Sequence, residues 1–253
     1  MIRADQVFKS FDDNKVLKGI SHTFQKGKCN LIIGRSGAGK TVMLKILVGL
    51  MSPTKGKVWY DDRDFFSLNK VQLREIRNEV GMLFQGSALF DSMTVEENVR
   101  FPLDMFTKLS KKERQERVDY VLERVELTGA GDRYPSEVSG GMQKRVGIAR
   151  SIVLRPKYLF CDEPNSGLDP KTSILIDELI KNITYDDDIT TVINTHDMNS
   201  VMEIGDNIAL LHQGQLVWTG NKAEVMDSQN ERMEDFVFAS PFLHRLKEAA
   251  QRK

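Results

Sequence analysis

A glycine-rich loop at residues 34–41 constrains this sequence more than any other stretch. It follows the apolar strand pattern of residues 31–33 and runs into residues 42–50. In that second segment apolar side chains repeat at helical spacing, at Met43, Ile46, Leu47 and Leu50. A strand, a glycine loop and a helix, in this order, are the context in which such a loop binds phosphate groups.

Each residue of the loop suits phosphate binding. Glycines lack a Cβ, so their backbone N–H groups can close around phosphate oxygens. Lys40 adds a mobile positive charge, and the Thr41 hydroxyl can bind Mg²⁺. The helix that starts there directs its partial positive end at the phosphates. We expect the whole loop to contact the ligand: Gly34, Arg35, Ser36, Gly37, Ala38, Gly39, Lys40 and Thr41.

The charge and hydropathy of the 253-residue chain exclude some functions. The 36 Lys and Arg residues balance 36 Asp and Glu residues, so we expect no nucleic-acid partner. The longest apolar runs are far shorter than a membrane span, and the N-terminus does not resemble a signal peptide. We therefore expect a cytosolic chain in which Cys29 and Cys161 are reduced, buried thiols.

Strand and helix patterns alternate along the chain. Residues 2–11 and 16–24 read as two strands joined by a turn, which predicts an antiparallel pair. Residues 80–84 form the continuous apolar run that is typical of a fully buried strand. Further strand patterns lie at residues 57–60, 158–161, 190–194 and 208–211, with a helix at residues 171–183. Strands that alternate with helices predict a mainly parallel sheet.

The segment from residue 87 to 154 is helical in pattern and strongly charged. Its clearest helix starts at Ser110, where Glu113 completes a capping box. The apolar stripe of that helix is Val118, Val121, Leu122 and Val125. We predict an α/β fold: a P-loop NTPase core with a mainly parallel sheet, an N-terminal antiparallel β subdomain and an inserted α-helical subdomain. The predicted boundaries are 1–86 and 156–225 for the catalytic core, 87–155 for the helical subdomain and 226–253 for a C-terminal extension.

Polar side chains follow two of the later strands. The strand from Tyr158 leads into Asp162, which is placed to hold Mg²⁺, and Glu163, which can polarise the water that attacks a γ-phosphate. His196 follows the strand at 190–194. A lone histidine is more often structural, but ligands bind at the C-terminal ends of strands in open α/β sheets. We therefore expect His196 to contact the γ-phosphate.

A second anion-binding device begins the helix pattern that runs to Leu154. Ser139 provides an N-cap hydroxyl, and Gly140 and Gly141 leave the backbone N–H groups approachable. An ordinary capped helix is the alternative. The chain carries two such devices and only one set of Mg²⁺-binding and water-activating carboxylates, so something must bring the two devices together.

With these motifs the chain resembles the ATP-binding subunit of ABC transporters over nearly its full length. The matching segments are 34–41 (Walker A), 138–143 (the family signature), 158–163 (Walker B) and 166–169 (the D-loop). The resemblance implies an ATPase that uses ATP and Mg²⁺, with Gln85 as the Q-loop glutamine. It implies catalytic roles for Glu163, His196 and Gln85, and Mg²⁺ coordination by Thr41, Gln85 and Asp162.

The same resemblance implies an assembly. Two subunits sandwich two ATP molecules, and Ser139, Gly140 and Gly141 of each contact the γ-phosphate held by the other's Walker A motif. Phe11 stands where a tyrosine of the family often stacks on adenine, and a core position is its alternative. Phe90 lies in the region where family members receive the permease, so it is a candidate interface anchor or a core residue, as is Phe101.

Residues 81–90, 99–103 and 139–142 look most like the ATPase of Mla or MCE-type phospholipid transporters. That likeness implies transport between the inner and outer membranes, powered from the cytoplasmic face of the inner membrane by a peripheral subunit. The expected partners are a second copy, a transmembrane permease subunit, an MCE-domain substrate-binding protein and a small regulatory subunit. Two alternatives remain open: the ATPase of another importer or exporter, and a soluble non-transport ABC ATPase such as one in iron–sulfur cluster assembly.

The C-terminal extension from residue 226 is too apolar for a free linker, with Phe236, Val237, Phe238, Phe242 and Leu246. We predict that it belongs to neither subdomain and packs on the partner subunit or a regulatory protein. Docking on its own core is the alternative.

Overall fold

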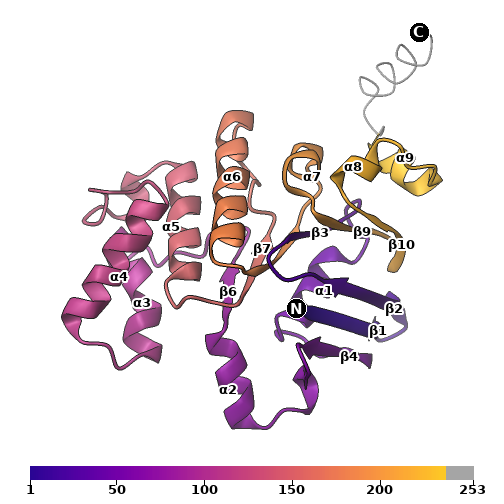
Figure 1. The fold of residues 1–253 in the computed structure, drawn as a ribbon, viewed down its shortest axis with the longest axis horizontal. Coiled ribbons are helices and arrows are strands. Elements are labelled where there is room, and N and C mark those ends of the chain that lie inside the picture. The colour runs from indigo at the N-terminus through magenta and orange to yellow at the C-terminus, as the bar shows by residue number, and fades with distance from the viewer. Residues whose placement is uncertain (238–253) are drawn as a thin grey trace. The chain divides into compact units, whose positions relative to one another are not determined.

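The computed structural model describes residues 1–237 and divides into two compact units. Unit 1 comprises residues 1–25, 29–66 and those from 194 onward, and unit 2 comprises residues 26–28 and 67–193. Figure 1 shows the helices and strands of both units. The strands predicted near residues 80 and 158 fall in unit 2, so the compact units differ from the predicted subdomains. The subdomain boundaries at 87 and 156 stay a prediction.

Unit 1 contains an antiparallel sheet with the strand order β2-β1-β4-β5. Its strands are β1 (Ile2–Phe11), β2 (Asn14–Phe24), β4 (Lys55–Tyr60) and β5 (Arg63–Asp64) (Figure 1). β1 pairs antiparallel with β2 and with β4, which confirms the predicted pair. Along β1, Ile2, Ala4 and Val7 are buried and the residues between them are exposed. This alternation is expected when one face of a sheet covers the core.

Unit 1 also contains β3 (Cys29–Ile33), which pairs in parallel with β9 (Asn207–His212). β9 in turn pairs antiparallel with β10 (Gln215–Gly220). All five residues of β3 are buried, including the free thiol of Cys29. The glycine loop therefore starts from a strand that is fixed on both of its faces.

The helix after the loop is α1 (Lys40–Leu47), which buries Met43, Ile46 and Leu47 as predicted. Its predicted extension to Leu50 is wrong. Gly49 has a φ of 80°, a left-handed conformation that commonly ends a helix. Leu50 is consequently 60% exposed.

The strands of unit 2 are β6 (Val80–Leu83), β7 (Tyr158–Asp162) and β8 (Thr190–Asn194), in the order β8-β7-β6. β6 pairs in parallel with β7, as predicted. The prediction that β6 is fully buried is wrong, because it is the last strand in this order and its residues alternate between half-buried and buried. The flanking helices are α2 (Lys70–Asn78) and α6 (Pro170–Asp186).

Three further helices of unit 2 pack against one another: α3 (Val95–Phe106), α4 (Lys111–Arg124) and α5 (Gly140–Ile152). Short 3₁₀ turns lie at Phe65–Ser67 and Pro135–Glu137. The predicted capping box of α4 is present, because Ser110 Oγ accepts from the Glu113 N–H and the Glu113 carboxylate accepts from the Ser110 N–H. The predicted stripe of α4 is buried: Val118, Val121, Leu122 and Val125.

The described part of the C-terminal extension packs on unit 1, so the prediction that it belongs to neither subdomain is wrong for this part. It contains α9 (Glu231–Val237), which follows α7 (Met198–Ile204) and α8 (Lys222–Val225). Met233 is fully buried, and Asn230 Nδ2 donates to the Val217 carbonyl of β10 at 3.1 Å. Phe238, Phe242 and Leu246 lie outside the described residues.

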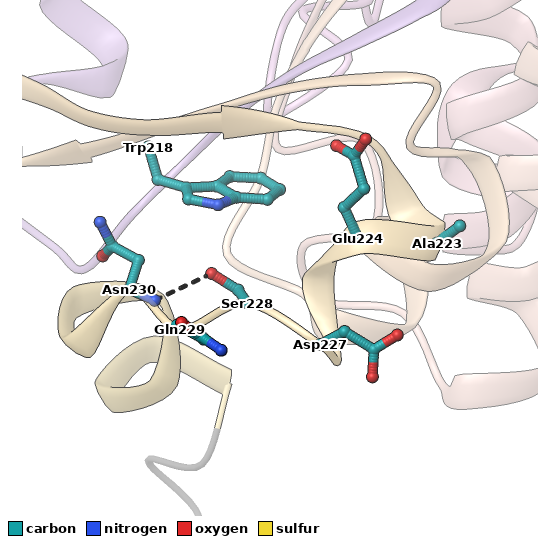
Figure 2. A pocket seen from close by; sticks show the side chains of 7 residues that line it. All are labelled: Trp218, Ala223, Glu224, Asp227, Ser228, Gln229 and Asn230. Atoms are coloured by element: carbon teal, nitrogen blue, oxygen red, sulfur yellow. Dashed lines mark hydrogen bonds between the residues drawn. The ribbon is translucent and has the colours of Figure 1, made fainter.

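A cavity of about 450 Å³ lies between Trp218 on β10 and the link that joins α8 to α9. Figure 2 shows the side chains that line it. Asn230 closes this link, because its N–H donates to Ser228 Oγ at 3.2 Å and its Oδ1 accepts from the N–H of Met233. None of the predicted site residues lines the cavity, which is formed by Trp218, Ala223, Glu224, Asp227, Ser228, Gln229 and Asn230.

Replacing the buried Met233 tests this packing. Met233→Ala is expected to lower the free energy of unfolding by about 2–5 kcal/mol, because the truncated side chain leaves a cavity. Met226→Ala is the matched control, since Met226 lies in the same segment and is 52% exposed. Urea denaturation of both variants measures the difference. Equal stabilities would show that α9 does not contribute to the core of unit 1.

No helix within residues 1–237 combines the length and hydropathy that crossing a bilayer requires.

Candidate nucleotide site

The glycine loop in unit 1 is folded tightly on one side and open on the other. Gly34 has a φ of 145°, and a Cβ there would lie 2.3 Å from the carbonyl oxygen of Leu211. Only glycine fits that approach to β9. Gly37 also has a positive φ, of 79°, but a Cβ there would meet nothing within 4 Å. The open side is where a phosphate would approach the backbone N–H groups.

Lys40 lies inside this loop rather than extending into solvent. Its side chain is 7% exposed, and its Nζ donates to the carbonyl oxygens of Gly34 at 2.8 Å and Arg35 at 3.4 Å. The loop residue Ala38 is also buried, whereas Ser36 is exposed. Arg35 is engaged elsewhere, since its guanidinium donates to the Asp235 carbonyl of α9 at 3.0 Å. The loop therefore presents one fixed cation to a ligand.

The start of α1 differs from the starts of the other helices. Its N-cap residue is Gly39, and no side chain among residues 1–237 caps it. Each helix from α2 to α8 has a capping side chain: Asn69, Thr94, Ser110, Ser139, Asp169, Asp197 and Asn221. A helix start without a side-chain cap, beside a fixed lysine, suits an anion.

Thr41 has a partner that the motifs did not reveal. Asn194, the last residue of β8, is fully buried and its Nδ2 donates to Thr41 Oγ1 at 3.3 Å. The only signal in the sequence is a polar residue at the end of an apolar strand, just before His196. That signal does not name the partner, which is 153 residues away.

His196 and Phe11 are both exposed in unit 1. His196 follows β8, whose continuation is fixed because the Thr195 N–H donates to the Ile32 carbonyl at 3.1 Å. Phe11 is 43% exposed, and the Lys9 ammonium lies 5.1 Å from its ring centroid. The core alternative for Phe11 is therefore wrong, and its stacking on a base stays a prediction.

In unit 2, Gln85 follows β6 in a turn that α5 holds in place. Its Nε2 donates to Ser166 Oγ at 3.2 Å, which leaves Oε1 available to a ligand. Its backbone carbonyl accepts from Lys144 Nζ, and burial lowers the pKa of Lys144. Farther along the turn, Arg150 donates to the carbonyls of Ser87 at 2.6 Å and Ala88 at 2.8 Å. We define the Gln85 loop as residues 84–90.

Two residues of this loop are strained. Ser87 has a φ of 60° and Ala88 a φ of 49°, conformations that cost on the order of 1–3 kcal/mol for residues with a Cβ. The hydrogen bonds from Arg150 fix both residues in these conformations. Sequence reasoning missed this pair of contacts, since an arginine on a helix surface is usually solvated.

The carboxylates of unit 2 lie at the end of β7. Asp162 is the last residue of the strand, and Glu163 follows it with a φ of 48°. Both are half-buried. The Ser166 N–H donates to the Glu163 carbonyl at 3.1 Å, which closes the turn. Strained non-glycine backbone that is held by its surroundings concentrates at functional sites.

The signature residues of unit 2 begin α5. Ser139 is the N-cap, and its Oγ accepts from the Met142 N–H at 3.3 Å. A Cβ on Gly141 would lie 2.7 Å from Thr172 Cγ2, so this glycine is needed for packing against α6. A Cβ on Gly140 would meet only Leu168, at 3.9 Å. Packing among residues 1–237 therefore does not require a glycine at position 140.

The predicted Mg²⁺ ligands fit the ion in their chemistry. They are a hydroxyl (Thr41), an amide oxygen (Gln85) and a carboxylate (Asp162), and Mg²⁺ prefers oxygen ligands. Thr41 Oγ1 accepts one hydrogen bond and has a second lone pair for a metal ion, and Gln85 donates through Nε2, so its Oε1 can bind a metal ion. These residues would hold the ion together with oxygens of a phosphate ligand.

Phe90 and Phe101 lie outside the buried core, and their rings contact each other. Phe90 is 41% exposed, and its ring centroid lies 4.9 Å from that of the half-buried Phe101. The guanidinium of Arg150 lies 5.9 Å from the same Phe90 ring. Met105 and Phe106, at the end of α3, are 58% and 53% exposed.

Comparisons with known proteins identify a family. A family profile described as ABC transporter matches residues 17–166. Over 239 residues the chain is 38% identical to the "Probable ribonucleotide transport ATP-binding protein mkl" of Mycobacterium tuberculosis, covering 93% of this chain and 66% of that protein. Over 257 residues it is 35% identical to the chloroplastic protein TRIGALACTOSYLDIACYLGLYCEROL 3 of Arabidopsis thaliana, covering 95% and 74%. The chain thus spans slightly less than two thirds of the mycobacterial relative.

The fold also matches that of a solved structure. The dimeric ATP-binding cassette MJ0796, in a post-hydrolysis state bound to ADP and Pi, is similar with a TM-score of 0.79 and 32% identity. The match covers 88% of this chain and 99% of that one. It confirms the predicted α/β P-loop fold with its antiparallel subdomain.

Proposed function

This chain belongs to the ABC transporter family, and on that premise we propose that it is the ATP-hydrolysing subunit of a membrane transporter. Cassettes of this family bind ATP with Mg²⁺ and couple its hydrolysis to transport. One observation carries the proposal for this chain: the uncapped start of α1 with Lys40 fixed beside it. A phosphate chain satisfies both groups at once.

The roles that we propose follow the chemistry of each group. The loop at residues 34–41 binds the phosphates, and Thr41, Gln85 and Asp162 hold Mg²⁺, which neutralises charge on the phosphate oxygens. Glu163 orients and polarises the attacking water, and His196 contacts the γ-phosphate. Phe11 offers an exposed ring to the adenine.

We propose that two copies form the working unit. Gly140 is open, and the Ser139 cap accepts from the Met142 N–H, so the N–H groups of Gly140 and Gly141 would be left for an anion. In a two-fold dimer each copy would supply this helix start to the nucleotide of the other, and the solved relative MJ0796 is dimeric.

Nucleotide binding tests the catalytic half of the proposal. Lys40→Met is expected to weaken Mg·ATP binding roughly tenfold to a hundredfold, because a charge-assisted hydrogen bond to phosphate is lost. Lys45→Met is the matched control, since Lys45 is exposed on the same helix. Titration calorimetry measures both affinities. If the unmodified chain binds no Mg·ATP, or if the two variants behave alike, the assignment of the loop fails.

For the substrate, we propose phospholipid moved between the inner and outer membranes, by a complex on the cytoplasmic face of the inner membrane. Support comes from the resemblance at residues 81–90 and from a chloroplast relative named for a glycolipid. A second candidate is another importer, because the mycobacterial relative is named for ribonucleotide transport.

The proposed partners are a transmembrane permease, an MCE-domain protein and a small regulatory subunit. The permease would dock on exposed apolar side chains such as Phe90, Met105 and Phe106. Purification of the tagged chain from native membranes tests this proposal. We expect a multispanning permease and an MCE-domain protein to copurify. Recovery with soluble partners alone would favour a non-transport ATPase, and a permease without an MCE-domain protein would favour the second candidate.

A further inference from the structure

Asn194 carries a fully buried amide. It ends β8, in which every residue is buried, and its own side chain is 0% exposed. Burying an amide in such a place is unfavourable unless its polar atoms find partners. Its Nδ2 donates to Thr41 Oγ1 at 3.3 Å. Both residues belong to unit 1.

This hydrogen bond is made to the hydroxyl of Thr41, the group that would bind Mg²⁺. A threonine hydroxyl has one proton and two acceptor positions. Asn194 occupies one acceptor position, and the other stays available. Thr41 is the second residue of α1, where a β-branched side chain already has few rotamers. A single hydrogen bond therefore suffices to select one of them.

We infer that Asn194 is a positioning residue for Thr41: its amide fixes the hydroxyl in the orientation in which it serves as an Mg²⁺ ligand. The inference rests on the proposed function, since it requires Mg·nucleotide in the glycine loop. It assigns to the end of β8 a role in binding the metal ion, in addition to the role proposed for His196.

A purely structural role makes a different prediction. If Asn194 only stabilises unit 1, its loss weakens nucleotide binding equally with and without Mg²⁺. If it orients Thr41, its loss reduces only the gain in affinity that Mg²⁺ provides. The informative quantity is the Mg²⁺ gain, the ratio of the ADP dissociation constant in EDTA to that in excess Mg²⁺.

The test measures the Mg²⁺ gain by titration calorimetry of the full chain. Asn194→Leu removes the donor at similar volume, and Asn194→Ser, which is too short to reach Thr41, serves if the leucine variant does not fold. We expect either to reduce the Mg²⁺ gain about threefold to tenfold, the worth of one hydrogen bond, with ADP affinity in EDTA unchanged. Thr191→Val is the matched control, because its buried hydroxyl on β8 pairs with Thr184 at 2.6 Å.

A double-mutant cycle with Thr41→Val completes the test. Without the Thr41 hydroxyl, the further change at Asn194 is expected to leave the Mg²⁺ gain as it is. Full additivity of the two changes, or a Mg²⁺ gain that is normal in both Asn194 variants, overturns the inference and leaves the proposed function intact. Absence of any Mg²⁺-dependent ADP binding by the unmodified chain overturns both.

Discussion

Glu163→Gln is expected to lower ATP turnover roughly 10² to 10⁴-fold while leaving ATP affinity unchanged. A positioned general base contributes about this factor, and the amide keeps the shape of glutamate without its basicity. The half-buried Glu163 follows β7 directly, and a closed turn fixes its backbone. Steady-state phosphate release measures the turnover, and titration calorimetry measures the affinity.

The left-handed backbone of Glu163 supplies a stringent control. Glu126 is also a glutamate with a positive φ, of 57°, and it lies in unit 2. Its carboxylate pairs with Arg145 at 2.7 Å. Glu126→Gln makes the same chemical change in a similar conformation and is expected to leave turnover unaltered. Near wild-type turnover of Glu163→Gln would remove the assignment of this residue as the base.

Gly140→Asp is expected to reduce ATP hydrolysis about 10² to 10³-fold, because it places a negative charge where the site would stabilise developing negative charge, an effect comparable to losing one preorganised donor. Its effect on the single chain should be small or favourable. A Cβ at this position meets only Leu168 at 3.9 Å, and an acidic residue in the first turn of a helix is stabilising. The aspartate instead repels a nucleotide that a second copy presents. Stability measured in urea should therefore stay level while turnover falls.

The control for this variant is Lys111→Asp, which places an acidic residue at the first position of α4 in the same unit. A mixture tests the assembly directly. At ATP concentrations too low to fill the Lys40→Met site, each variant alone is expected to turn over little ATP, but a mixed dimer keeps one intact site. We expect roughly a quarter of wild-type turnover, since half of the dimers mix and each restores one of two equivalent sites. No recovery on mixing would contradict a site shared between copies.

Local signals predicted the elements that depend on local physics. The capping box of Ser110 and Glu113 and the buried run of β8 were readable from the sequence because caps and apolar runs act over a few residues. The end of α1 was not, since the apolar Leu50 continues the helical spacing and only the backbone of Gly49 stops the helix. The edge position of β6 and the docking of α9 depend on distant neighbours, which no local pattern contains.

The candidate site divides in the same way. Motif residues such as Lys40 and Glu163 were predictable because their chemistry requires fixed types at fixed spacing. Asn194 was not, because its meaning depends on which residue the end of β8 reaches. The contacts of Lys144 and Arg150 with the Gln85 loop could not be predicted for the same reason, because in the sequence both residues resemble ordinary surface cations.

Through these two contacts, α5 connects the Gln85 loop mechanically to its own N-terminus. The helix is 13 residues long, which corresponds to about 20 Å, and it begins with Gly140, which we propose faces the nucleotide of a second copy. Lys144 and Arg150, six residues apart on α5, both donate hydrogen bonds to the Gln85 loop. A shift of this loop would therefore shift α5 with it. A permease that displaces Phe90 would thus also displace the start of α5 at Gly140. In the proposed dimer, the position of the permease would then limit how closely the two copies approach each other around the nucleotides.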